Sequence, residues 1–194
     1  QSPDLLLNLS ASPWHLGKSE KRIELLRKVS GKCQCPVVYV NSVGGNDELI
    51  FDGMSMSVDR DGTLLANSDS FKECIEVHDL NDQCPTTSLP LNNPMERLRL
   101  ALVLGVRDYA HKSGFSKGLI GLSGGIDSAV TAAIAVEALG QENVIGISLP
   151  SSISSQHSRE DAKELAENLG IQFHTLPIQG MVDAATNELE PLFK

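Results

Sequence analysis

The sequence has few cysteines and no long hydrophobic run, and each absence narrows the classes to which it can belong. The four cysteines, Cys33, Cys35, Cys74 and Cys84, match neither paired Cys-x-x-Cys zinc motifs nor a dense disulfide framework, so we expect reduced structural thiols. The longest apolar runs, such as residues 100–106, fall short of the roughly 20 residues that span a bilayer. No basic-then-apolar leader opens the chain. We therefore expect no membrane partner and a cytoplasmic location.

Basic residues are also scarce, because Lys and Arg number 16 whereas Asp and Glu number 25, which gives a formal net charge of −9. A chain of this charge offers no broad basic face, so we expect no nucleic acid as a partner. A polyanion would have to be bound by a local site. The 194 residues, of which 41% are hydrophobic and 21% charged, are typical of a folded protein with one ordinary or two small domains.

The first region, residues 1–80, mixes strand and helix patterns. Its clearest feature is a hairpin, because apolar and polar residues alternate on one side of the Asp61-Gly62 turn and an apolar run follows on the other. The patterns predict strands at residues 5–9 and 36–41, a helix over residues 19–29 that Gly31 ends, hairpin arms at residues 54–59 and 64–66, and one more strand formed by residues 71 and 74–77.

Residues 81–93 lack hydrophobic periodicity and contain two prolines, two threonines and three asparagines, which is the composition of a linker. We place a domain boundary there, between residues 1–80 and a second region, residues 94–194. Asn93 is predicted to cap a helix that begins at Pro94 and ends near Gly114. The apolar stripe of this helix is predicted to consist of Met95, Leu98, Leu102, Val106 and Tyr109.

The second region continues with alternating strands and helices. Strands are predicted at residues 118–122, 144–149 and 171–176, and helices at residues 126–139 and 158–169. Strands that alternate with helices in this way pair in parallel through right-handed crossovers. Only three strands are predicted where about 5–6 are typical of a sheet, so we expect an incomplete sheet, with no closing element before Lys194.

The most informative segment is Ser123-Gly124-Gly125-Ile126-Asp127-Ser128, which lies between a predicted strand and a predicted helix. Unpaired backbone N–H groups and the positive end of the helix dipole meet at such a point, which suits an anion. Gly124 and Gly125 let the backbone approach an oxygen cluster closely. Ser123 and Ser128 add hydroxyl donors. The segment therefore predicts a phosphate site.

Two commoner phosphate loops are absent. The Walker loop requires a lysine, which residues 121–136 lack, and the dinucleotide fingerprint requires a Gly-x-Gly-x-x-Gly spacing that this segment does not provide. Asp127 would repel bound phosphates unless a cation intervened, so we predict Mg²⁺ between Asp127 and the phosphates. The alternative is structural: a tight turn followed by a favourable acid in the first turn of the helix.

The loop resembles that of the pyrophosphate-releasing ATP enzymes, which include synthetases of NAD, GMP, asparagine and argininosuccinate. Residues 149–158, after the second predicted strand of this region, further resemble the segment that lies along the ATP in NAD synthetases. Ser158 also fits a helix-capping box with Asp161, and His157 fits a solvated loop residue. The resemblance implies that ATP is contacted by Gly121, Leu122, Ser123, Gly124, Gly125, Ile126, Asp127, Ser128, Leu149 and Ser158.

The first region resembles the C-terminal part of a nitrilase-like amidase domain. The resemblance rests on residues 4–13, on Gly17-Lys18, on residues 38–45 and on residues 51–55. It implies that Ser12 and Lys18 hold glutamine, which is chemically reasonable because a hydroxyl and a cation suit the α-amino-acid end of that substrate. Lys18 also fits a solvated residue at the start of a helix.

Together the resemblances point to the family of glutamine-dependent NAD synthetases. They imply an α/β fold: the C-terminal part of a nitrilase-like α-β-β-α sandwich, then the first half of a doubly wound parallel-sheet adenine-nucleotide domain. In this family a Glu, a Lys and a Cys release ammonia from glutamine through a thioester, and the ammonia amidates deamido-NAD while ATP yields AMP and pyrophosphate. These three residues precede the 4–13 motif, so we expect them before Gln1 and expect this chain to be a piece across the domain junction, without catalytic residues.

The resemblance also implies the partners of the protein. They are small molecules, namely ATP, deamido-NAD and glutamine or ammonia, with Mg²⁺ as a cofactor and a homo-oligomeric parent enzyme. Two alternatives stay open. The chain could belong to another amidotransferase with the same loop and a different carboxylate or carbonyl substrate, or it could be a catalytically silent nucleotide-binding piece.

Overall fold

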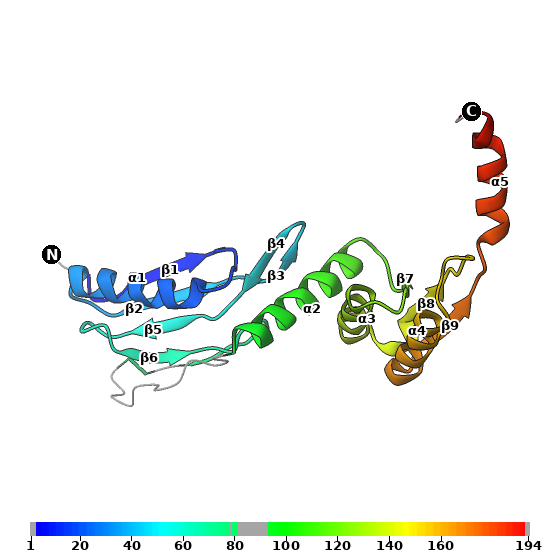
Figure 1. The fold of residues 1–194 in the computed structure, drawn as a ribbon. Helices are drawn as coiled ribbons and strands as arrows, with labels where there is room; N and C mark the ends of the chain where they lie inside the picture. Colours follow the sequence, from blue (N-terminus) through cyan, green and yellow to red (C-terminus); the bar gives the residue numbers. More distant parts are fainter. Residues whose placement is uncertain (1–2, 78, 81–92, 193–194) are drawn as a thin grey trace. The chain divides into compact units, whose positions relative to one another are not determined.

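The computed structural model describes residues 3–77, 79–80 and 93–192 (Figure 1). The chain divides into two compact units, Gln1–Tyr109 and Ala110–Lys194. Cys84 and most of the predicted linker, residues 81–92, lie outside the described residues. Among the helices of the described ranges, none is both long and apolar enough to cross a membrane.

The first unit is built on a four-stranded sheet. Its strands in spatial order are β1 (Leu6–Ser10), β2 (Val37–Asn41), β5 (Met56–Val58) and β6 (Leu64–Asn67). β1 is parallel to β2, and the other neighbouring pairs are antiparallel. Helix α1 (Lys18–Cys33) packs on this sheet, where Ile23 and Leu26 join Val37 and Val58 in an apolar core. The hairpin and the first two strands predicted for this region are therefore confirmed.

Helix α1 continues past its predicted end. It runs through Gly31 to Cys33, because a single glycine costs a helix only about 1 kcal/mol relative to alanine. The helix ends at Gln34, which takes a left-handed conformation (φ 53°) and donates its backbone N–H to Ser30 O at 2.8 Å. Gln34 thus makes the terminal bond that a glycine commonly makes after a helix. The prediction that Gly31 ends this helix is wrong.

The sequence patterns do not predict a second hairpin, formed by β3 (Val43–Asn46) and β4 (Leu49–Asp52). Gly44 and Gly45 interrupt the apolar alternation that would have revealed β3. Gly45 has a packing role, because a β carbon there would lie 3.3 Å from Cα of Gly105 on helix α2 (Pro94–Lys112). Gly45 and Gly105 therefore allow the strand to lie directly on the helix.

The strand predicted at residues 71 and 74–77 does not form. Phe71 is buried with a φ of 63°, and its backbone N–H bonds to Asp52 O at 2.8 Å. Ile75 and Val77 are almost fully exposed, and no described strand pairs with them. The prediction is wrong because it rested on apolar residues alone, and the positive φ of Phe71 is incompatible with a regular strand at that residue.

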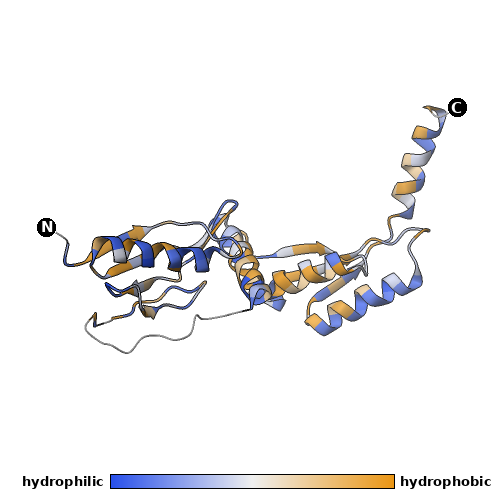
Figure 2. Ribbon diagram, turned by 60° about the vertical axis from the view of Figure 1, so that its left-hand side comes forward, coloured by the Kyte–Doolittle hydropathy of each residue, from blue (hydrophilic) through white to orange (hydrophobic). Residues whose placement is uncertain are grey.

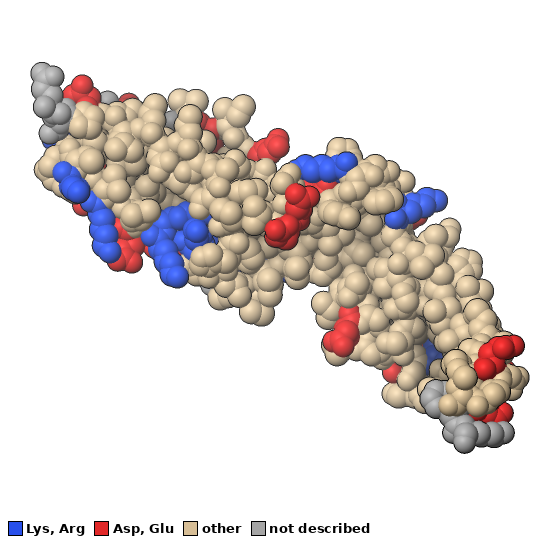
Figure 3. All heavy atoms as spheres, turned by 90° about the horizontal axis from the view of Figure 1, so that it is seen from above, with Lys and Arg blue, Asp and Glu red and all other residues tan. Residues whose placement is uncertain are grey.

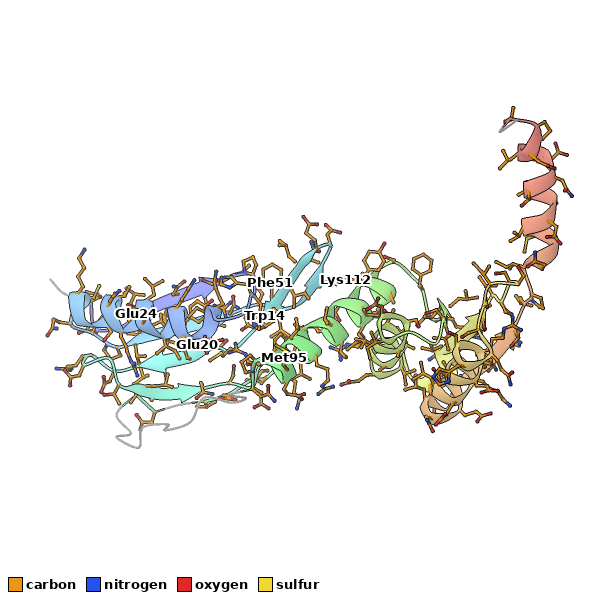
Figure 4. The ribbon with its side chains drawn as sticks, viewed as in Figure 1. Trp14, Glu20, Glu24, Phe51, Met95 and Lys112 are labelled. Atoms are coloured by element: carbon orange, nitrogen blue, oxygen red, sulfur yellow. The ribbon has the colours of Figure 1, made fainter. Side chains whose placement is uncertain are left out.

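Helix α2 begins as predicted, because Asn93 Oδ1 accepts the backbone N–H of Met95 at 3.0 Å. Its buried side, however, is not the predicted stripe. Ala101 and Leu104 are buried together with Phe71, and Trp14, which Figure 4 labels, meets Phe71 edge-on. The ring centroids are 5.6 Å apart. The helix carries apolar residues on two sides, so hydrophobicity did not identify the packed one. The predicted stripe is half-buried at Leu98 and exposed at Met95, Leu102, Val106 and Tyr109.

The second unit contains a parallel three-stranded sheet in the order β7 (Gly118–Gly121), β8 (Val144–Ser148) and β9 (Gln172–Thr175). Helices α3 (Ile126–Leu139) and α4 (Gln156–Leu169) pack against each other, with Ala132, Val144 and Ala166 in one core. Figure 2 shows the largely apolar colouring of α3. The predicted alternation of strands and helices and their parallel pairing are confirmed.

Further helical segments of the second unit were not predicted from the sequence. They are the 3-10 helices η1 (Gln141–Asn143) and η2 (Glu190–Leu192) and helix α5 (Gln179–Leu189). Helix α5 follows β9 and is almost entirely exposed. The expectation was that no element closes the sheet before Lys194, and the exposed helix α5 does not contradict it.

Candidate functional site

A pocket of about 460 Å³ lies at the carboxyl ends of β7 and β8. Ligands of open α/β sheets bind in the crevice at the carboxyl ends of the strands, so the fold itself points to this place. Apolar side chains, hydroxyls and one guanidinium form its wall. The lining residues are Gly121, Leu122, Ser123, Ile147, Ser148, Leu149, Pro150, Ile153, Ser154, Ser155, Ser158 and Arg159.

The predicted phosphate loop joins β7 to α3 beside this pocket. Ser123 Oγ lies 3.1 Å from Ser128 Oγ and accepts the backbone N–H of Gly125 at 3.2 Å. Ser128 Oγ donates to Gly125 O at 2.9 Å. The two serines of the motif thus hold the turn in shape through bonds within the loop.

Gly124 packs against the first turn of α4. It has a φ of 80°, and a β carbon on it would lie 2.3 Å from Ser158 O and 2.8 Å from Ser158 Cα. Glycine is required by both the conformation and the contact. The N-terminal ends of α3 and α4 therefore meet beside the pocket, and both helix dipoles direct their positive ends there.

Helix α4 begins at Gln156, two residues before its predicted start. The cap is Ser155, whose Oγ accepts the backbone N–H of Ser158 at 3.1 Å. Ser155 is the last residue in an extended conformation, so its hydroxyl faces the free N–H groups of the first turn. The prediction that Ser158 caps this helix is wrong. Ser158 lies within the first turn instead and lines the pocket.

Arg159 fastens the loop between β8 and α4. Its guanidinium donates to Ser151 O and Ser154 O, both at 3.0 Å, and the side chain forms part of the pocket wall. The sequence reasoning missed Arg159 because no motif contained it. Its charge nevertheless supplies a cation near a phosphate loop that lacks the Walker lysine.

Half of the residues predicted to contact ATP line the pocket, namely Gly121, Leu122, Ser123, Leu149 and Ser158. The others, Gly124, Gly125, Ile126, Asp127 and Ser128, form the adjoining loop and the first turn of α3. Their contact with a nucleotide remains a prediction. Pro150, Ile153 and Ser154 of the 149–158 segment also line the pocket, and so does Ser148, which no sequence pattern assigned to a site.

Asp127 is exposed in the first turn of α3. In the part of the chain that the structure describes, no three His, Cys, Asp or Glu side chains gather into a metal site. Mg²⁺ is commonly held by one or two carboxylates together with substrate phosphates and water. The single carboxylate therefore fits a magnesium ion that arrives with a nucleotide.

Ser12 and Lys18 flank the turn between β1 and α1 in the first unit. Ser12 donates its backbone N–H to Asn41 Oδ1 at 2.8 Å, and its carbonyl accepts from Arg22 Nη2 at 2.8 Å. Lys18 begins α1, with its backbone N–H on His15 O at 3.1 Å. Both residues are half-buried. Side chains hold the main chain of Ser12 on both sides.

A buried ionic cluster of Arg22, Asp52 and Arg97 lies next to this turn. Asp52 is fully buried, and its Oδ1 is 2.6 Å from Arg22 Nη1. Arg97 Nη2 is 3.9 Å from Asp52 Oδ2 and donates to the hydroxyl of Ser19. Sequence reasoning missed the cluster, because its members come from α1, β4 and α2 and share no motif.

Charged side chains of both signs are interspersed on the face that Figure 3 shows, and uncharged residues make up most of it. Two of the exposed or half-exposed glutamates have lowered pKa values. The pKa of Glu24 is lowered by a hydrogen bond from Lys28, and that of Glu96 by a hydrogen bond from Arg99. The absence of a nucleic acid partner remains a prediction.

Comparison with known proteins finds similarity to NAD synthetases over the whole chain. Residues 99–193 match the family model for NAD synthase. The glutamine-dependent NAD(+) synthetase of Synechocystis sp. is 48% identical over 100% of this chain, and that of Aquifex aeolicus is 39% identical over 96% of it. The chain covers 36% and 39% of those two proteins, so it spans little more than a third of their length.

Solved structures give the same result. The glutamine-dependent NAD+ synthetase from Acinetobacter baumannii, in complex with ADP, matches with a TM-score of 0.91 and 37% identity, over 98% of this chain and 37% of that one. The enzyme of the same name from Cytophaga hutchinsonii matches with a TM-score of 0.83 at 22% identity, which shows the shared fold. The chain is therefore a mixed α/β protein with a region similar to NAD synthase. More particularly, this chain is a relative of the glutamine-dependent NAD(+) synthetases, as its motifs predicted.

Proposed function

We propose that the protein amidates deamido-NAD to NAD, with ATP as the energy source and glutamine as the nitrogen donor. The observation that carries this proposal is the pocket beside the Ser-Gly-Gly-x-Asp-Ser loop, in a chain similar to proteins named glutamine-dependent NAD(+) synthetase. ATP would react with the carboxylate of deamido-NAD and expel pyrophosphate. Ammonia would then displace AMP from the adenylate and form the amide.

Binding and charge neutralisation are the proposed tasks of the second unit. Backbone N–H groups of Gly124 and Gly125 would donate to phosphate oxygens, with Ser123 and Ser128 adding hydroxyl donors. Since the N–H of Gly125 now donates to Ser123 Oγ, that hydroxyl would turn aside when a phosphate oxygen takes its place. Catalysis here would come from positioning of the reactants.

Mg²⁺ would be held by Asp127 together with phosphate oxygens. When bound, the ion would neutralise phosphate charge and polarise the bond that breaks. The Asp127 carboxylate would fix its position at the start of α3. Such an ion would let a chain of net charge −9 bind a polyanion.

Glutamine would be held in the first unit by the hydroxyl of Ser12 and the ammonium of Lys18.

The proposed domain division, with residues 1–80 from a nitrilase-like glutaminase, 81–93 as a linker and 94–194 from the synthetase, rests on the sequence patterns. The doubly wound and sandwich assignments, the homo-oligomeric state and the cytoplasmic location belong to the same proposal.

The proposal is tested on the protein expressed from its complete reading frame. Purified protein with ATP, Mg²⁺ and glutamine should convert deamido-NAD to NAD with one pyrophosphate released per amide. A panel of other carboxylate and carbonyl acceptors separates the remaining candidates: pyrophosphate release with another acceptor alone would indicate a different amidotransferase. ATP binding without turnover of any acceptor would indicate a silent nucleotide-binding protein.

A further inference from the structure

The buried ionic cluster contacts the segments that carry both proposed glutamine-holding residues. Arg22 bonds to Asp52 through Nη1 and to the carbonyl of Ser12 through Nη2, at 2.6 and 2.8 Å. Arg97 donates to the hydroxyl of Ser19, the residue after Lys18. One guanidinium therefore fixes Ser12 directly, and the other fixes the first turn of α1, which Lys18 begins.

Asn41 extends the cluster to the second backbone group of Ser12. Its Oδ1 accepts the Ser12 N–H at 2.8 Å, and its Nδ2 lies 3.3 Å from Asp52 Oδ1. Both the N–H and the carbonyl of Ser12 are thus bonded to side chains that contact Asp52. Ser12 therefore cannot shift without breaking its hydrogen bonds to Asn41 and Arg22.

A contribution to the stability of the fold does not by itself account for the buried ionic cluster. The side chains of Arg22, Asp52 and Arg97 are only 5%, 0% and 9% exposed, and a buried ion pair is often no more stabilising than apolar residues of similar volume. Among the described residues, Asp52 Oδ2 and Nε of both arginines also have no hydrogen-bond partner. A planar guanidinium fork, by contrast, is well suited to fixing geometry.

We propose that the buried ionic cluster positions Ser12 and Lys18 for glutamine, which makes Arg22, Asp52 and Arg97 positioning residues for the use of glutamine as nitrogen donor. This inference rests on the proposed function. Arg97 is the contribution of α2, the helix in which the match to the NAD synthase family begins at residue 99. Its Nη1 also lies 3.6 Å from Oε1 of Glu20 on α1, labelled in Figure 4. Helix α2 is thereby fastened to the glutamine-holding turn.

The test compares glutamine with ammonia as nitrogen donor in the protein expressed from its complete reading frame. In Arg97→Met the KM for glutamine should rise by about tenfold or more, because a small misplacement of binding groups has effects of this size or larger. The kcat/KM for ammonia and the KM for ATP should stay unchanged. Arg97→Lys, which keeps the charge and loses the fork, should show a smaller rise in the KM for glutamine. The matched control is Arg99→Met on the same helix, since Arg99 pairs with Glu96 on the same helix and should change neither donor.

Ser19→Ala keeps the inference testable if Arg97→Met fails to fold. It removes only the hydroxyl that accepts from Arg97, and it should raise the KM for glutamine in the same selective manner. Equal losses with both donors, or an unchanged KM for glutamine in Ser19→Ala and Arg97→Lys, would overturn the inference. If the unsubstituted protein forms no NAD from either donor, the proposed function fails and the inference falls with it.

Discussion

Gly124 lies so close to the backbone of Ser158 that a β carbon on it would be 2.3 Å from the Ser158 carbonyl oxygen. We expect Gly124→Ala to weaken Mg²⁺-ATP binding by at least about tenfold, or ~1.4 kcal/mol. Either the phosphate loop or the first turn of α4 must move, and alanine also disfavours a φ of 80°. Isothermal titration calorimetry of the chain with ATP and Mg²⁺ measures the change.

The matched control for this substitution is Gly180→Ala. Gly180 lies in α5 of the same unit, and a β carbon there would meet nothing within 4 Å. Its Kd for ATP should equal that of the unsubstituted chain. If Gly124→Ala also left the Kd unchanged, the loop would not be the nucleotide site.

Asp127→Asn should remove most of the effect of Mg²⁺ on ATP affinity. In the presence of Mg²⁺ we expect weaker binding, because the amide is a poorer ligand for the ion than a carboxylate. With EDTA in place of Mg²⁺, the affinity should be equal or higher, since the repulsion between Asp127 and the phosphates is gone. Titrations with and without Mg²⁺ measure both. Glu137→Gln, on the same helix, serves as the control. If Asp127→Asn kept the Mg²⁺ dependence of the unsubstituted chain, Asp127 would not be the metal ligand.

The elements that the sequence predicted well are those whose pattern is local. The strands of the second unit are short apolar runs between glycine-rich or polar turns, and α3 is an alanine-rich stretch. The hairpin at Asp61-Gly62 was likewise visible from alternation and turn chemistry. The hairpin of β3 and β4 was not predicted, because Gly45 breaks the strand pattern. Its reason is a close contact with Gly105 of α2, a residue 60 positions away.

The same contrast between local patterns and long-range contacts holds for the residues of the candidate site. The Ser-Gly-Gly-x-Asp-Ser loop is contiguous and therefore recognisable, whereas Arg159 acts on carbonyls of a preceding loop and belongs to no motif. Ser155 and Ser158 are both plausible caps in the sequence, and only the backbone conformation decides between them. Asp52 and Arg97 are charged residues that a sequence reading assigns to the surface, and tertiary structure alone brings them together in the interior.

Ser155→Ala should destabilise the second unit by about 1 kcal/mol, which is typical for the loss of an N-cap. The substitution leaves the Ser158 N–H without the oxygen that now accepts it at 3.1 Å. Thermal unfolding followed by far-ultraviolet circular dichroism measures the change. Ser152→Ala is the control, because Ser152 contributes its backbone N–H rather than its hydroxyl to the bond with Gln179. Equal unfolding temperatures for the two variants would contradict the assignment of Ser155 as the cap.

The pair of Glu96 and Arg99 at the start of α2 should give stability that depends on pH. The hydrogen bond from Arg99 lowers the pKa of Glu96 below its ordinary value of 4.5, more than partial burial raises it. The folded state therefore favours the ionised carboxyl. The stabilisation should be fully present above about pH 5 and lost as the pH falls through the lowered pKa of the folded state.

Glu96→Gln removes this titration and tests the sign of the effect. Urea unfolding of the first unit can be followed by the fluorescence of Trp14, the one tryptophan of the chain. The unsubstituted chain should be more stable than Glu96→Gln at about pH 7, and the difference should shrink towards zero at an acidic pH at which the carboxyl is protonated in both folded and unfolded states. Glu188→Gln on α5 controls for the loss of one negative charge elsewhere. A difference that is the same at both pH values, or that grows on acidification, would show that the ionised form of Glu96 does not stabilise the helix.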